Sequence, residues 1–318
     1  MAKIAIAGGS GQVAREVIDA LEAADKHEIT IFTRRPLSSD IVKPGVSYQV
    51  VDYNDKDDLV KALQGIHTVL SFIQLLSDPG QKSQRNLIDA CVLAGVERFA
   101  PSEYGSAGTV DMPWWAGKEE VRQYLRELNK NGKLLEYTLF QPGVFLDYLA
   151  SPYQTAKHVV PLDTVFDFQN RRAIVVEGHE DAIMTFTSTR DLATAVALAV
   201  DYNGGEWPEV SGIRGNRVSV SRVIEIGERV RGSPFAIEKV KLENLEAGAL
   251  NTSWTVGKKH HAVSDEDALA LFRTVTIGML LSSVKGAWDV SDEVNKLFPE
   301  LCFEEIETFL NKIWSGKP

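Results

Sequence analysis

Short apolar runs alternate with helical periodicities over the first 150 residues of the chain. Runs typical of buried strands occupy residues 3–7, 28–33, 47–55, 67–74, 97–105 and 135–145. Segments with one apolar face at helical spacing follow them, at residues 15–25, 55–65, 81–95 and 118–130. This alternation predicts an α/β fold, a Rossmann-type doubly wound parallel sheet.

The pattern is more mixed beyond residue 150. Two short strands are expected around a turn at Gly178, and further strands and a helix at 221–232 follow. Ser188 or Thr189 can cap a helix over residues 188–201, which we expect to return to the main sheet. The last 55 residues are largely helical in pattern.

A glycine-rich turn, GGSGQVA over residues 8–14, joins the first strand to the first helix. Residues without a Cβ allow a tight turn and let the backbone approach a pyrophosphate, whose charge meets the N–H groups that open the helix. The turn therefore predicts dinucleotide binding, with an ordinary strand-to-helix turn as the alternative. The expected contacts are Gly8, Ser10, Gly11, Gln12 and Val13.

The second strand ends with Arg34 and Arg35 and without an acidic residue. A carboxylate there would bind the ribose 2′-hydroxyl of NAD, whereas paired guanidiniums bind a 2′-phosphate bidentately. The arginines therefore favour NADP(H) over NAD(H). Two solvated loop arginines are the alternative.

The ends of the third and fourth strands are expected beside the cofactor, because ligands bind at the carboxyl ends of strands in such sheets. Asp52 is expected to end the third strand, where an acid can meet the adenine edge. Capping of the next helix is the alternative, although Asp55 is the better candidate for that cap. Phe72 and Gln74 lie at the end of the fourth strand.

The net charge of −10 excludes some classes of partner. An acidic surface repels phosphate backbones and anionic lipid headgroups, so we expect neither nucleic acid nor membrane as partner. Cys91 and Cys302 lie outside any C-x-x-C motif, which indicates a reducing compartment. The first strand begins at residue 3 and leaves no room for a signal peptide, so a cytoplasmic protein is expected.

No metal is expected, because no His, Cys, Asp or Glu cluster has metal-site spacing. His260 and His261 are adjacent, and as strand neighbours they would face opposite sides.

Several stretches carry a family resemblance: GGSGQVA, the post-strand Arg34, QRNLIDACVLAGVERF, APSEYG, Lys118 and YTLFQPGVFLDY. With them the chain resembles the NmrA-like and isoflavone-reductase-like branch of the atypical short-chain dehydrogenases. The resemblance covers about the first 150 residues, and beyond residue 160 only short stretches such as TSTRDLATAVALAVD are similar.

The resemblance implies a reductase with NADPH in the crevice of the sheet. Its substrate would lie between a Rossmann domain, residues 1–150, and a smaller C-terminal α+β substrate-binding part, residues 151–318. In this family a lysine just after the PSEYG-type segment acts at the substrate, and Lys118 occupies that position. Ser102 and Tyr104 match the strand-end segment, with Ser102 and Lys118 also expected at the cofactor. Gln84 matches a glutamine of the family's helix.

The tyrosine of the usual Tyr-x-x-x-Lys dyad is missing. In ordinary short-chain dehydrogenases it donates a proton, while the lysine lowers its pKa and holds the nicotinamide ribose. With Lys118 as the lysine, the tyrosine position is Trp114, whose indole cannot serve as a general acid. Lys118 then either handles the proton itself, aided by a lowered pKa, or only fixes the cofactor. An exposed lysine that pairs with Glu119 or Glu120 is the alternative.

Aromatic residues near these segments could wall a substrate pocket, although plain core positions are the alternative. They are Tyr104, Trp114, Trp115, Phe145 and Tyr148. A second Tyr-x-x-x-Lys, from Tyr153 to Lys157, lies past the sixth strand. That is the wrong place for the dyad, so a surface or substrate-loop segment is expected there.

Three functions fit these observations. The first is an NADPH-dependent reductase of a small, apolar, aromatic or heterocyclic specialised metabolite, with Lys118 polarising or protonating the acceptor. The second is a redox-sensing regulator that binds NADP(H) without catalysis, which the missing tyrosine favours and Lys118 opposes. The third is an isomerisation or rearrangement enzyme that retains NADP. A monomer or homodimer is expected.

Overall fold

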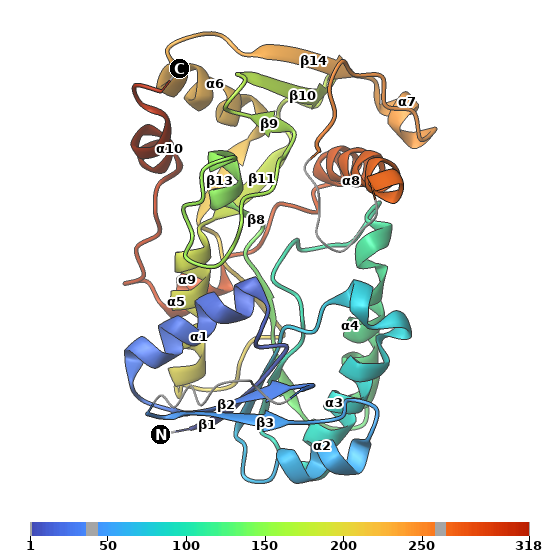
Figure 1. The fold of residues 1–318 in the computed structure, drawn as a ribbon, viewed down its shortest axis with the longest axis vertical. Coiled ribbons are helices and arrows are strands. Elements are labelled where there is room, and N and C mark those ends of the chain that lie inside the picture. Colours follow the sequence, from blue (N-terminus) through green and yellow to red (C-terminus); the bar gives the residue numbers. More distant parts are fainter. Residues whose placement is uncertain (1, 36–43, 258–264, 318) are drawn as a thin grey trace.

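The computed structural model describes residues 2–35, 44–257 and 265–317. The main sheet lies toward the N-terminal end of the molecule, and a second layered region lies at the opposite end (Figure 1). Six parallel strands follow the order β3 (Val46–Val50), β2 (Glu28–Thr33), β1 (Lys3–Ala7), β4 (Thr68–Ser71), β5 (Arg98–Ala100), β6 (Glu136–Tyr137). The order switches direction between β1 and β4, where the crevice of a doubly wound sheet opens. The predicted Rossmann-type fold is confirmed.

Helices cover both faces of this sheet because its central strands are apolar on both sides. Ile4 and Ile6 of β1 belong to one core, whereas Ala5 and Ala7 belong to the other, since successive side chains point to opposite faces. The first core includes α1 (Gln12–Ala24) and α5 (Thr189–Asp201); the second includes α2 (Lys56–Ala62), α3 (Lys82–Ala94) and α4 (Ala116–Leu128).

Helix α5 packs along α1, although it comes from the C-terminal half of the chain. Its N-cap is Ser188, whose hydroxyl accepts a hydrogen bond from the Asp191 backbone at 3.1 Å. The cap expected at Asp55 is also present, because its carboxylate accepts from the Asp58 backbone at 3.1 Å. The division of the chain at residue 150 stays a prediction.

The single sixth strand expected over residues 135–145 is wrong. Only β6 pairs with β5, and the chain then forms β7 (Leu139–Gln141) and β8 (Val144–Phe145). Pro142 lacks a backbone donor and Gly143 has φ +76°, so the run cannot continue in one ladder. Strand β7 pairs instead with β12 (Val210–Gly212), and β8 pairs with β11 (Ile183–Thr187).

The C-terminal half builds two further small sheets. One has the order β14 (Ala236–Val240), β10 (Arg172–Val176), β9 (Phe166–Asp167); the other has β13 (Asn216–Ser219), β11, β8. Besides α5, the described helices of this half are α6 (Val220–Arg231), α7 (Leu242–Glu246), α8 (Asp265–Val284), α9 (Glu293–Leu297) and α10 (Ile306–Trp314). The strands on either side of Gly178, β10 and β11, therefore belong to different sheets.

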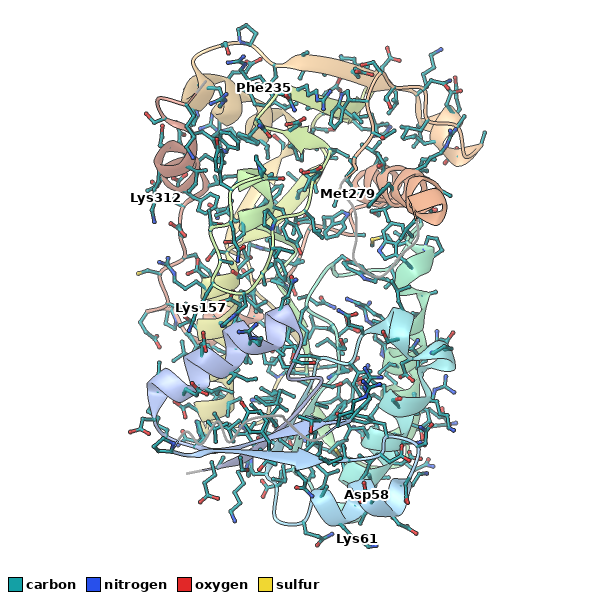
Figure 2. The ribbon with its side chains drawn as sticks, in the orientation of Figure 1. Asp58, Lys61, Lys157, Phe235, Met279 and Lys312 are labelled. Atoms are coloured by element: carbon teal, nitrogen blue, oxygen red, sulfur yellow. The ribbon has the colours of Figure 1, made fainter. Side chains whose placement is uncertain are left out.

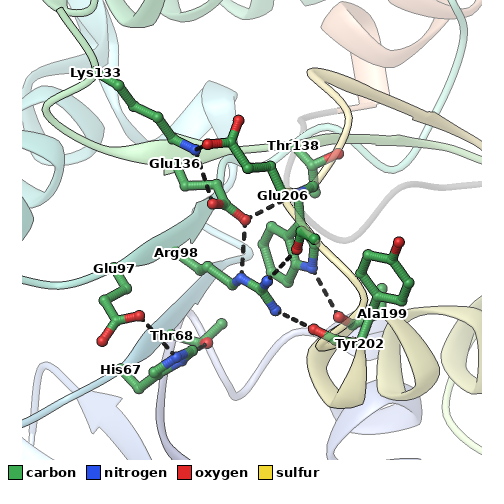
Figure 3. Close-up of polar contacts among 12 residues, drawn as sticks. His67, Thr68, Glu97, Arg98, Lys133, Glu136, Thr138, Ala199, Tyr202 and Glu206 are labelled. Carbon is green, nitrogen blue, oxygen red and sulfur yellow. Dashed lines mark hydrogen bonds and ion pairs between the residues drawn. The ribbon is translucent and has the colours of Figure 1, made fainter.

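Arg98 organises a polar cluster at the start of β5 (Figure 3). Its guanidinium donates to the Glu136 carboxylate at 2.9 Å and to the carbonyls of Tyr202 and Gly205 at 2.6 and 3.0 Å. These contacts tie the chain after α5 to the sheet. They lie at the amino end of the strands, opposite the edge where ligands bind in such sheets, so the cluster is structural.

The described helices include none that is long and apolar enough to cross a membrane. Within the same residues, no group of three His, Cys, Asp or Glu side chains is arranged to hold a metal ion. His260 and His261 lie outside the described residues. The predictions of no metal and of a cytoplasmic protein stay predictions.

Candidate cofactor and active site

The glycine turn between β1 and α1 brings the backbone very close to the end of β4. Gly8 has φ +74°, and a Cβ there would lie 2.7 Å from the carbonyl carbon and oxygen of Phe72. The backbone N–H of Gly11 donates to the Gly8 carbonyl at 3.0 Å and closes the turn. A side chain at position 8 is therefore excluded both by the left-handed conformation and by space.

The N-terminus of α1 is suited to bind an anion. Gly11 is its N-cap and supplies no side-chain cap, and the first turn carries no acidic residue. Its first backbone N–H groups lack intrahelical partners and carry the positive end of the helix dipole. Ser10 is exposed at this turn and Val13 is half-buried, whereas the Gln12 amide oxygen accepts from the Val160 backbone at 3.2 Å.

Arg34 and Arg35 directly follow β2, and both are exposed. Neither forms an ion pair or hydrogen bond with any other residue that the structure describes. Both arginines stand at the carboxyl end of β2, the edge of the sheet where ligands bind in such folds.

Asp52 does not end the third strand, because β3 stops at Val50. Its carboxylate accepts hydrogen bonds from the Asn54 backbone at 2.9 Å and from the Asn54 side chain at 3.2 Å. Asp52 therefore stabilises the turn before α2, where Asp55 forms the cap. An adenine contact by Asp52 stays a prediction.

Tyr53 is a residue that the sequence reasoning missed. Its ring is buried in the core, and its hydroxyl has no described partner at full hydrogen-bond geometry, although the Gly8 backbone N–H lies close enough to act on it. Burial raises the pKa of Tyr53 to about 12, while the Gly8 backbone and the Arg34 guanidinium act to lower that pKa. The phenol is thus a neutral donor between the glycine turn and Arg34. The sequence offered one signal for this position, because Tyr53 directly follows Asp52, a residue that we expected beside the cofactor.

An aromatic stack lies at the ends of β4 and β5. The rings of Phe72 and Tyr104 are 4.4 Å apart and nearly parallel. Tyr104 has φ +40°, and its buried hydroxyl has no partner among the described residues. A non-glycine residue held in this conformation indicates a position that the surrounding structure constrains. Gln74 and Ser102, predicted at the same edge, are exposed and half-buried, respectively.

Lys118 is buried in the first turn of α4. Its ammonium donates a hydrogen bond to the Glu103 backbone carbonyl and lies 3.9 Å from the centre of the Trp115 ring. Burial lowers the pKa of Lys118 from 10.5 to about 8; the Glu103 charge acts to raise that pKa and the Arg122 charge to lower it. The alternative of an exposed lysine paired with Glu119 or Glu120 is wrong.

Glu103 and Arg122 form a buried ion pair behind Lys118. The guanidinium donates to both carboxylate oxygens, at 2.6 and 3.0 Å, and the two side chains are 1% and 5% exposed. Arg122 also donates to the Ala107 carbonyl at 3.0 Å. The pair was not predicted, because Glu103 and Arg122 are separated in sequence and only the fold brings them together.

Trp115, and not Trp114, covers Lys118. A Cβ at Gly105 would lie 2.7 Å from the Trp115 ring and 3.3 Å from Lys118 Nζ, so the ring and the ammonium share a tight space. Trp114 points toward α8, where a Cβ at Gly278 would lie 2.6 Å from its ring. A substrate contact by Trp114 stays a prediction.

The remaining predicted residues separate into two groups. Phe145 and Tyr148 contact each other with ring centres 5.3 Å apart, next to the strand ends. Gln84 accepts a buried hydrogen bond from Ser71, so it supports β4 from α3 and is structural.

The second Tyr-x-x-x-Lys lies away from the glycine turn. Lys157 pairs with Asp19 of α1 at 2.5 Å and is exposed beside that helix (Figure 2). Tyr153 packs against Trp314 of α10, with ring centres 5.2 Å apart. The two residues therefore have separate structural contacts.

The lowered pKa of Lys118 predicts a stability effect that depends on pH. Below about pH 8 the folded protein must bury the charged ammonium, which costs on the order of 3 kcal/mol for a shift of this size. Between pH 8 and 10.5 only the unfolded chain keeps the proton, so the free energy of unfolding rises with pH. We expect Lys118→Met to be more stable than the wild type at pH 7, with a gap that shrinks toward pH 10.

Urea unfolding at pH 7 and pH 10 measures this gap. Lys61→Met is the matched control, because Lys61 is an exposed lysine on α2 (Figure 2) and its replacement changes the net charge equally. A gap that does not depend on pH would show that Lys118 is not buried in its charged form.

The chain was compared with known families and structures. The model of the NmrA-like family matches residues 1–277. The chain belongs to the NmrA-like family. This NmrA-like protein is 30% identical to oxidoreductase BOA1 of Botryotinia fuckeliana over 95% of its own length and 96% of that protein.

Solved structures show the same fold at lower identity. A crystal structure of isoflavone reductase matches with a TM-score of 0.68 at 19% identity, covering 98% of each chain. The NADPH-dependent quinone oxidoreductase QOR2 of Escherichia coli, solved with NADPH, also matches with a TM-score of 0.68 at 19% identity, covering 98% of this chain and 100% of QOR2. The NmrA-like protein therefore has the fold of both reductases.

Proposed function

We propose that this protein is an NADPH-dependent reductase of a small apolar metabolite, with Lys118 as the acid or polarising group. The observation that carries the proposal is a buried lysine of lowered pKa, held on the carbonyl of Glu103 just after β5. Its relatives support redox chemistry, since BOA1 is named an oxidoreductase and QOR2 is an NADPH-dependent one.

The residues at the carboxyl edge of the sheet fit NADP(H). Gly8 lets the turn pack tightly against the backbone of Phe72, where a Cβ would clash, and the uncapped start of α1 offers N–H donors to a pyrophosphate. Arg34 and Arg35 offer charged donors to a 2′-phosphate, and the buried hydroxyl of Tyr53 lies near Gly8 and Arg34. Gly8, Ser10, Gly11, Arg34, Arg35 and Tyr53 are the proposed cofactor contacts on this side.

Lys118 replaces the missing tyrosine in the proposed reaction. Bound NADPH supplies a hydride to an electron-poor carbon of the substrate. The Lys118 ammonium is held against the Glu103 carbonyl and can donate its proton to the substrate atom that gains electron density. A pKa of about 8 suits this transfer, because the group is mostly protonated at neutral pH and yet is a stronger acid than an ordinary lysine.

The surroundings support an aromatic or heterocyclic substrate. Phe72 contacts Tyr104 and Phe145 contacts Tyr148, all four in or against one apolar cluster. The Trp115 ring covers the Lys118 ammonium. Such rings bind flat apolar molecules by stacking and by burying their surface. We infer that the substrate is a specialised metabolite of this class.

The test mixes the protein with NADPH and a panel of enones, quinones and benzylic ethers. We expect NADPH oxidation, followed at its nicotinamide absorbance, with at least one class and a reduced product by mass spectrometry. No oxidation across the panel would contradict the proposal, and capture of a protein partner that depends on NADP(H) would then favour a regulator. A product of unchanged oxidation state would instead identify a rearrangement enzyme.

A further inference from the structure

Residues 103–107 include the Glu103 carbonyl that accepts a hydrogen bond from Lys118. The Arg122 side chain of α4 holds this segment in place. Lys118 and Arg122 are four residues apart, so both project from the same face of the helix. Lys118 donates to the backbone carbonyl of Glu103, and Arg122 donates to the carboxylate of that same residue. Glu103 therefore contacts both cations, one through its main chain and one through its side chain.

Arg122 also fixes the rest of this segment. It donates to the carbonyls of Ala107 and Ser106 at 3.0 and 3.4 Å, beyond its contacts with Glu103. The segment is thus clamped at both ends. Because the Glu103 carbonyl is fixed in this way, the Lys118 ammonium that donates to it has a defined position just after β5.

Two charges of opposite sign lie near Lys118. Among the described residues, the Glu103 charge acts to raise its pKa and the Arg122 charge acts to lower it. Glu119, on the same helix, is directed outward to Arg122 and Arg126 at 3.6 Å each. The Trp115 ring covers the ammonium and packs against the Trp288 ring, with ring centres 5.8 Å apart, and neither brings a charge.

We propose that the buried Glu103–Arg122 ion pair is the positioning element of Lys118, which fixes the carbonyl that holds its ammonium and balances the charge around it. The proposal rests on the proposed function for the use of Lys118, although the placement itself can be tested without activity. An ion pair with a purely structural role would also stabilise the fold. Its removal, however, would not shift the titration midpoint of Lys118 in opposite directions in the two single variants.

The test titrates Lys118 by NMR in protein labelled with ¹³C at lysine Cε, its resonance assigned by its loss in Lys118→Met. In Glu103→Gln the titration midpoint of Lys118 should fall by about one pH unit, because an attractive charge is lost. In Arg122→Gln it should rise by about as much, because a repulsive charge is lost. In the double variant, which replaces the ion pair by two neutral amides, the midpoint should return close to that of the wild type.

Arg126→Gln is the matched control, since Arg126 lies one turn further along α4, half-exposed and paired with Glu209 at 2.9 Å. It should leave the midpoint unchanged. Midpoints that move in the same direction in both single variants, or that move in neither, would overturn the proposal. If one single variant does not fold, the other together with the double variant still gives the sign. If the Lys118 midpoints shift as expected but the wild type oxidises no NADPH with any substrate of the panel, the proposed function is rejected and the positioning role of the ion pair stands.

Discussion

Lys118→Met is expected to lower the kcat of NADPH oxidation by about 10²- to 10⁴-fold, the usual contribution of a positioned general acid. Methionine fills a similar volume but has no proton and no charge, so the acceptor is neither polarised nor protonated. The affinity for NADPH should change less than about threefold, because the phosphate contacts proposed at the glycine turn and the arginines remain. Stopped-flow turnover and fluorescence titration with NADPH measure the two quantities separately.

The pH dependence provides a second measure of the same residue. If the protonated ammonium is the active form, kcat/KM should fall as pH rises through about 8, where Lys118 loses its proton. Lys118→Arg keeps a charge that is not lost in this range, so any residual activity should lose this fall. Full activity of Lys118→Met would contradict the assignment of Lys118, and loss of NADPH affinity with unchanged kcat would make it a cofactor anchor only.

Arg34→Glu is expected to weaken NADPH binding by about 100-fold or more and to change NADH binding little. A charge-assisted contact to the 2′-phosphate contributes about 1.5–3 kcal/mol, and the introduced carboxylate adds repulsion to that loss. NADH lacks the 2′-phosphate and has a free 2′-hydroxyl instead. The introduced carboxylate can accept a hydrogen bond from that hydroxyl. The dissociation constants of both cofactors, from quenching of tryptophan fluorescence, give the ratio directly.

Lys61→Glu is the control for the change in net charge, because Lys61 lies on the outer side of α2, away from the glycine turn (Figure 2). It should weaken NADPH binding only slightly at physiological salt. Equal losses of NADPH and NADH affinity in Arg34→Glu would mean that the turn itself is distorted. If neither affinity changes, Arg34 is removed from the 2′-phosphate site and Arg35 remains the candidate.

Much of the cofactor side of the site could be predicted, because its chemistry is local. The strand, glycine turn and helix at the N-terminus follow from side-chain periodicity and from the backbone freedom of Gly8 within a few residues. Arg34 and Arg35 follow directly from the end of one strand. Lys118 was reached through the family resemblance, and its burial confirms that it is not a surface lysine.

The sequence by itself thus determined the Rossmann-type alternation of strands and helices and the glycine turn, since each depends on neighbours along the chain. Only the tertiary structure decided that residues 135–145 split between three sheets, because β6 pairs with β5 of the main sheet whereas β7 and β8 pair with strands from beyond residue 180. It also placed Arg122 against Glu103 and the Tyr53 hydroxyl beside Gly8. These contacts join residues whose separation in sequence carries no periodic signal, and packing of the buried faces brings them together.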